Sequence, residues 1–98
     1  MIVRIVNLTF REGGKADFYH LIEQVGDQIR RQPGCVHLEI LEDIQRTNAI
    51  MTYSHWVDEQ SLNDYRNSQF FSRVWPQIKD LLIEPAMARS YMTTKKIE

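Results

Sequence analysis

The first ten residues limit the possible folds most, because they read as a strand with apolar side chains on both faces. The run MIVRIVNLTF is rich in β-branched residues and is followed by the turn-forming pair Gly13-Gly14. Alternate side chains of a strand point to opposite sides of its sheet. The apolar residues of one side are Val3 and Ile5, and those of the other are Ile2, Val6, Leu8 and Phe10. Neither face of this strand is therefore suited to contact with water.

Helical periodicity appears in two later regions. Apolar residues recur at helical spacing over residues 15–32, and Pro33 stops that pattern. Asp58 and Ser68 are each placed to cap a helix, since their side-chain oxygens can accept hydrogen bonds from free backbone N–H groups. Pro76 falls inside the second of these helices. We expect that helix to kink there, or to end and restart with the proline in its first turn.

Three further strands complete the pattern. Residues 35–41 and 49–56 are predicted to form a hairpin, and residues 87–94 a last strand. The first of these should place three apolar side chains on one face: Val36, Leu38 and Ile40. The order predicts an α+β fold of the ferredoxin-like split βαβ type, a four-stranded antiparallel sheet with helices on one face. Helices cover only one apolar face of the first strand, so a second copy of the chain should cover the other, as a homodimer.

Composition limits the classes of partner. The 98 residues suffice for a single domain over 1–98. The 12 basic and 13 acidic residues are scattered and give a net charge of -1, so neither nucleic acid nor a membrane is an expected partner. No segment reads as a signal peptide or membrane span. The lone Cys35 excludes an internal disulfide and fits a cytoplasmic protein, and the three histidines lack metal-ligand spacing.

The chain resembles the antibiotic biosynthesis monooxygenase (ABM) domain over nearly its whole length. The similarity lies in the segments MIVRIVNLTF, QPGCVHLEI, AIMTYSHW and WVDEQSLNDYRNSQFFSRVWPQIKDLL, taken in order. It implies a dimeric α+β barrel. It also implies that dioxygen attacks a small aromatic quinol or phenol without flavin, haem or metal as cofactor, because a deprotonated phenol can itself pass an electron to dioxygen. The protein then has to exclude water, hold the ring and stabilise the anion.

The resemblance also suggests catalytic donors. Asn7 is a polar amide on a face expected to be buried, so it needs a hydrogen-bond partner. The simpler interpretation is a bond to neighbouring backbone. Relatives that act on phenols or haem carry an asparagine at the matching place, so Asn7 is the predicted donor to a substrate oxygen or to dioxygen. We expect a pocket between sheet and helices that is lined by Asn7, Trp56, Tyr65 and Trp75.

The aromatic residues carry the rest of the predicted site. Tyr65 lies where many relatives carry a histidine, and Trp75 lies where haem-degrading relatives place the histidine that ligates iron. An indole cannot ligate iron, so haem breakdown is disfavoured, whereas the phenol of Tyr65 can donate a hydrogen bond inside an apolar cavity. The predicted substrate contacts are Trp56, Phe70, Phe71 and Trp75. A role in the hydrophobic core would account for each of these four as well.

His37 is a secondary candidate for a base, because an unperturbed imidazole has a pKa of about 6.5; a structural role is the simpler interpretation of a lone histidine. The pattern leaves its face of the sheet open, while His55 is expected at the dimer contact. Two alternative functions remain. One is a non-catalytic homodimer that binds a small hydrophobic ligand. The other is an isomerase or lyase on the same fold, which would need His37 as a working base.

Overall fold

The computed structural model describes all 98 residues as four strands and three helices. The strands are β1 (Ile2–Thr9), β2 (Cys35–Glu42), β3 (Ala49–Trp56) and β4 (Met87–Met92), and the helices are α1 (Gly14–Arg30), α2 (Glu59–Arg66) and α3 (Gln69–Lys79). The predicted order of elements is confirmed, although the last strand ends at Met92 rather than at residue 94. No helix combines the length and apolar character needed to cross a membrane.

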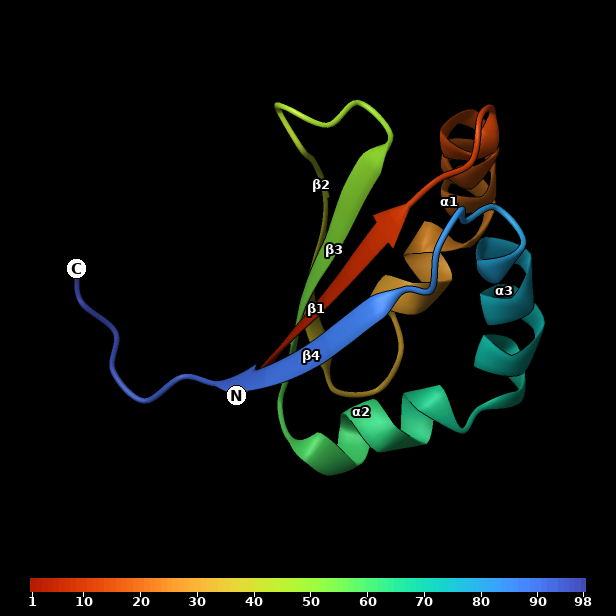
Figure 1. Cartoon of the computed structure of the whole chain (residues 1–98). Helices are drawn as coiled ribbons and strands as arrows, with labels where there is room; N and C mark the ends of the chain where they lie inside the picture. The colour runs from red at the N-terminus through yellow and green to blue at the C-terminus, as the bar shows by residue number, and fades with distance from the viewer.

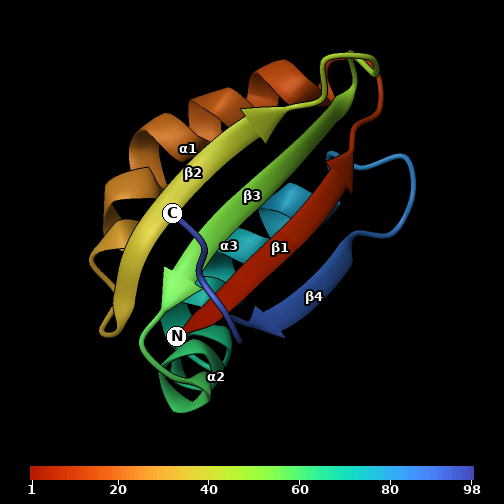
Figure 2. The same cartoon turned by 90° about the vertical axis from the view of Figure 1, so that its left-hand side faces the viewer.

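The sheet has the order β2-β3-β1-β4, and each neighbouring pair is antiparallel. All three helices lie on one side of it (Figure 1). Figure 2 looks at the opposite side, where the strands lie in front and the helices behind. The predicted α+β fold of the ferredoxin-like split βαβ type is therefore confirmed. We call the side that carries the helices the inner face and the other side the outer face.

Both predicted helix caps are present. The Asp58 carboxylate accepts a hydrogen bond from the backbone N–H of Ser61 at 2.8 Å, where α2 begins. The Ser68 hydroxyl accepts one from the backbone N–H of Phe71 at 3.1 Å, where α3 begins. These bonds satisfy N–H groups that have no partner inside their own helices. The two caps thus mark the starts of α2 and α3, which follow each other closely along the chain.

The helix α3 continues through Pro76. Of the two alternatives predicted at this proline, a kink or an end followed by a restart, the second is therefore wrong. Val74 and Ile78 are both buried, on either side of the proline in sequence and on the same face of the helix. Burial of this face offsets the hydrogen bond that proline cannot donate. The backbone carbonyl of Pro76 itself accepts a bond from the N–H of Asp80 at 3.1 Å, so the turn that follows is regular.

Most of the hydrophobic core lies between the inner face and the helices α1 and α3. Its eight buried residues are Leu8, Phe10, Phe18, Leu21, Ile50, Val74, Ile78 and Leu81. A smaller cluster joins the other end of the sheet to α2 and consists of Cys35, Trp56 and Leu62. The core is thus divided into two parts, and the space between them is where a cavity can form.

The two faces of β1 differ from the prediction in one respect. Arg4, Val6 and Leu8 are on the inner face, where they line the cavity described below. Because side chains alternate, Ile5 and Asn7 belong to the outer face, which no helix covers. Asn7 is exposed there. The prediction that Asn7 lies in a pocket between sheet and helices is therefore wrong.

A local irregularity changes the pattern of β2. The register between β2 and β3 shifts between Cys35 and His37, so Val36 has no partner in β3. Val36 is 39% exposed, while Leu38 and Ile40 lie on the inner face. Two of the three predicted side chains therefore share a face. The shift also places His37 opposite His55 of β3, on the outer face.

Candidate functional site: an aromatic pocket on the inner face

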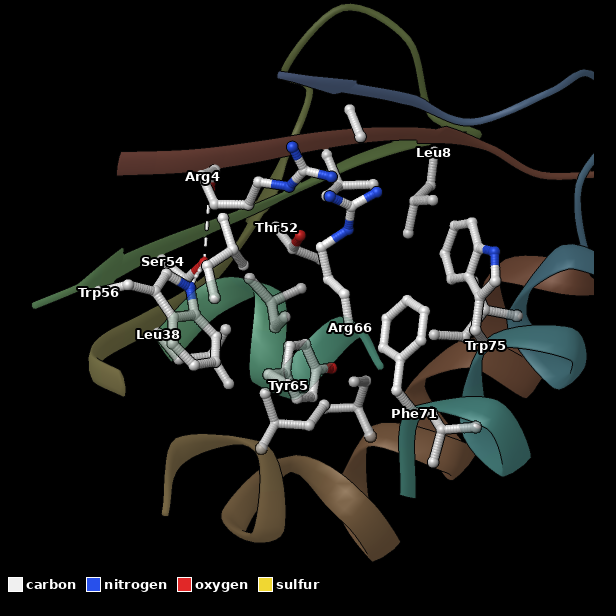
Figure 3. Close-up of a pocket in the computed structure, with 18 of the residues that line it drawn as sticks. Arg4, Leu8, Leu38, Thr52, Ser54, Trp56, Tyr65, Arg66, Phe71 and Trp75 are labelled. Atoms are coloured by element: carbon white, nitrogen blue, oxygen red, sulfur yellow. Dashed lines mark hydrogen bonds between the residues drawn. The ribbon is translucent and has the colours of Figure 1, made fainter. Parts of the chain in front are cut away.

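A cavity of about 380 Å³ lies between the inner face of the sheet and the helices. Its volume is in the range of about 300 to 1,000 Å³ that is usual for small-molecule sites. Of the 20 residues that line it, 15 are hydrophobic, so it favours an apolar ligand. Side chains of α2 and α3 form one of its walls (Figure 3).

Four aromatic rings form a continuous wall of the pocket (Figure 3). Trp56 and Tyr65 are stacked, with ring centroids 5.0 Å apart and an angle of 24° between the rings. Phe71 meets Tyr65 edge-on at 5.1 Å and stacks on Trp75 at 5.8 Å. Phe71 and Trp75 are four residues apart on α3, which places them on one side of the helix. The wall suits a flat aromatic molecule.

Tyr65 supplies a polar group within this wall. Burial, and to a lesser degree the neighbouring Cys35, raises the pKa of Tyr65 to about 12. The phenol is therefore protonated at every ordinary pH and can act as a hydrogen-bond donor. Apart from the hydrogen bonds within α2, the only hydrogen bonds of Tyr65 are those that its backbone carbonyl accepts from Ser68. Its hydroxyl is left free to donate to a bound molecule.

Trp56 is held in place by its polar edge. Its indole Nε1 donates a hydrogen bond to the hydroxyl of Ser54 at 3.0 Å, and that hydroxyl donates to the backbone carbonyl of Arg4 at 3.5 Å (Figure 3). Trp56 is 1% exposed and Ser54 is 6% exposed. The indole N–H is thus already satisfied, and the ring is almost wholly covered by its neighbours, including the stacked Tyr65. The residue serves both the core and the pocket wall.

Two arginines line the pocket, and neither was predicted from the sequence. Arg4 projects from β1 and Arg66 from the last turn of α2. Burial lowers the pKa of Arg4, and the positive charge of Arg66 lowers it further. One sequence signal could have revealed Arg4. It interrupts an otherwise apolar strand on the same face as Val6 and Leu8. A charged side chain on such a face is energetically costly, so it indicates a functional role.

Three predicted site residues lie outside this pocket. Asn7 is on the outer face, as described above. His37 is also on that face, where its Nε2 lies 2.6 Å from a carboxylate oxygen of Glu39. Phe70 packs against the main hydrophobic core instead of lining the cavity. The four remaining predictions are brought together by the structure, since Trp56, Tyr65, Phe71 and Trp75 all line the cavity.

No group of three or more histidine, cysteine, aspartate or glutamate side chains is arranged to hold a metal ion. The ionisable groups of the pocket lining are two arginines and one tyrosine, and the lining contains no carboxylate and no imidazole. The pocket therefore combines an apolar aromatic wall, one neutral hydrogen-bond donor and two cations. Such a site can bind an aromatic molecule and favours its anionic form.

Residues 1–76 match the family model of the antibiotic biosynthesis monooxygenases. The chain belongs to this family. A protein of Synechocystis described as uncharacterized is 24% identical over 90 residues, which are 92% of this chain and 61% of that protein. This chain thus spans less than two thirds of the length of that relative.

Solved structures share the fold. A protein of Deinococcus radiodurans, proposed to be an antibiotic biosynthesis monooxygenase, is 15% identical with a TM-score of 0.89, over 100% of this chain and 97% of that one. A mutant of SnoaB, a cofactor-independent oxygenase from Streptomyces nogalater, is 14% identical with a TM-score of 0.86, over 98% of this chain and 95% of that one. At such low identity these similarities define the fold and leave the substrate open.

Proposed function

We propose that this protein is a monooxygenase of small aromatic quinols or phenols, with the pocket on the inner face as its active site. The observation that supports this proposal most is the continuous aromatic wall, in which Tyr65 has a free and neutral hydroxyl group. Phe71 and Trp75 would hold the substrate ring, Trp56 would support Tyr65 by stacking on it, and Tyr65 would donate a hydrogen bond to the substrate oxygen. Membership of the ABM family supports the same reaction class.

The reaction needs no reductant besides the substrate. The anion of a hydroquinone passes an electron to dioxygen, a carbon–oxygen bond forms on the ring, and the O–O bond then breaks. One oxygen atom stays on the ring as a hydroxyquinone and the other leaves as water, so that hydroquinone plus dioxygen gives hydroxyquinone plus water. The protein contributes orientation, exclusion of water and stabilisation of negative charge on the substrate.

The test is dioxygen uptake by the full chain with a panel of reduced naphthohydroquinones, measured above their rate of autoxidation. Tyr65→Phe removes only the hydroxyl, and we expect it to lower kcat/KM by about tenfold to a hundredfold, the usual loss of a hydrogen bond to a charged group. Tyr91→Phe is the matched control, because Tyr91 is half-exposed on β4 outside the pocket. Absence of uptake across the panel, or equal effects of the two variants, would overturn the proposal.

One observation favours a second function, binding without turnover. The pocket lining contains no group that could accept a proton near neutral pH, because it has neither carboxylate nor imidazole. A binding protein would show a saturable rise in its melting temperature with an aromatic ligand and no consumption of dioxygen. The isomerase or lyase alternative loses its base, because His37 lies on the outer face beside Glu39.

We also infer that two copies of the chain associate through their outer faces. This face carries Val3, Ile5 and Tyr53 without a covering helix. The Nε2 atom of His55, on the same face, is buried and has no hydrogen-bond partner within the chain. A second copy on this face would cover its apolar side chains. The outer faces of the two chains would then cover each other.

A further inference from the structure

Arg4 and Arg66 place two positive charges at one end of the pocket. Figure 3 draws both guanidinium groups at the end that lies against β1, above the rings of Tyr65 and Phe71. The charges interact, since Arg66 contributes to the lowered pKa of Arg4. Two like charges repel each other, and the partly buried Arg4 also loses part of its hydration. Their proximity is unfavourable unless something compensates for it.

The chain itself provides no compensating charge. None of the residues lining the pocket is an aspartate or a glutamate, and neither arginine takes part in a salt bridge. Arg4 has one side-chain hydrogen bond, in which its Nη1 donates to the Ser90 hydroxyl at 3.0 Å. The side chain of Arg66 has none. Most of the ten N–H donors that two guanidinium groups carry are therefore available to a ligand.

The two arginines differ in burial. Arg4 is partly buried, and its guanidinium is oriented by the bond to Ser90 on the neighbouring strand β4. Arg66 is exposed at the end of α2. An arginine fixed inside the pocket and a second, exposed arginine can both bind the same anion. Guanidinium groups match the two oxygens of a carboxylate with paired hydrogen bonds.

We propose that Arg4 and Arg66 bind a carboxylate carried by the aromatic ligand of this pocket. The ligand class is an aromatic acid: its rings lie along the wall formed by Trp56, Tyr65, Phe71 and Trp75, and its carboxylate lies between the two guanidinium groups. For the reaction proposed above, the substrate is then a carboxylated quinol or phenol. This inference rests on the proposed function only for the identity of the reacting group.

The test compares binding of naphthoate and naphthamide, which differ in charge and have nearly the same shape. In calorimetric titrations at low salt and neutral pH, we expect wild-type protein to bind naphthoate at least about tenfold more tightly. Arg4→Gln and Arg66→Gln should each remove most of this preference and leave naphthamide binding within about twofold. Added salt should weaken binding of naphthoate alone.

Arg73→Gln is the matched control, because Arg73 is exposed on α3 and does not line the pocket. It should keep the full preference for naphthoate. Arg66 is exposed at the end of a helix, so its variant tests the proposal even if Arg4→Gln fails to fold, which circular dichroism would reveal. Equal affinity of wild-type protein for the two ligands, or an equal loss in Arg73→Gln, would overturn the inference.

Dioxygen uptake separates this inference from the proposed function. A carboxylated naphthohydroquinone and its methyl ester should be oxidised at different rates, with the acid favoured in kcat/KM by about tenfold or more. Equal rates for the two would refute the carboxylate site and leave the oxygenase standing. Preferential binding of naphthoate with no uptake from either hydroquinone would support the carboxylate site and refute the oxygenase.

Discussion

The role of each residue in β1 depends on the side of the sheet to which it points. Arg4 and Asn7 are separated by three positions, an odd number, so they lie on opposite faces. Both are polar residues in an apolar strand, and the resemblance to the ABM domain favoured Asn7 as the site residue. The structure places Arg4 in the pocket and Asn7 outside it. The same rule separates Leu38, which lines the pocket, from His37, which does not.

We predict that the pH dependence of dioxygen uptake follows the ionisation of the substrate phenol. The pKa of Tyr65 is raised to about 12, so the donor stays protonated below that pH and its contribution is lost only as the pH rises through it. The rate should therefore increase with pH and show no inflection near pH 6.5, the usual imidazole range. His37→Ala should leave the profile of kcat/KM unchanged. A profile that depends on His37 would contradict this mechanism.

At the level of elements, the caps and glycines define where each helix begins and how closely it packs. Asp58 and Ser68 begin α2 and α3, and so position Tyr65 and Phe71 beside each other. Gly14 begins α1 where the chain passes very close to the Leu81 carbonyl. A Cβ atom at position 14 would lie 2.4 Å from that oxygen. The absence of a side chain there lets α1 pack against the segment after α3.

Two glycines of α1 should respond oppositely to alanine. At Gly26, inside the helix, a Cβ atom would meet only the Ile22 side chain at 3.5 Å, an ordinary contact. Gly26→Ala should raise the free energy of unfolding by about 0.5 to 1 kcal/mol. Gly14→Ala should lower it by about 1 to 3 kcal/mol because of the contact with backbone. Urea denaturation of both variants checks this, and the same sign for both would contradict it.

At the scale of the whole molecule, the sheet has one covered face and one uncovered face. The helices and the pocket occupy the inner face, while the outer face carries Ile5 and Tyr53 at the centre of the sheet. A sheet with an apolar outer face is more stable when a second layer covers it. The dimer inferred above would place two pockets on the outside of the pair, each reached independently of the contact.

Sedimentation at micromolar concentration should give a mass of twice the 11.6 kDa of one chain. Ile5→Glu places a charge in the centre of the outer face, so it should shift the protein to a monomer. Ile44→Glu makes the same change at a loop residue that is 98% exposed, and it should leave the dimer intact. A monomeric wild-type chain, or dissociation caused by both variants, would contradict association through this face.

The sequence by itself determined the element order, both helix caps and four of the residues that line the pocket. These depend on local periodicity and on residues with specific roles at helix ends, which neighbouring positions encode. Only the tertiary structure decided which face of β1 meets the helices. Because both faces of that strand are apolar, alternation separates Arg4 from Asn7 without saying which one is covered. The pairing of Arg4 with Arg66, 62 positions later, likewise exists only after the chain has folded.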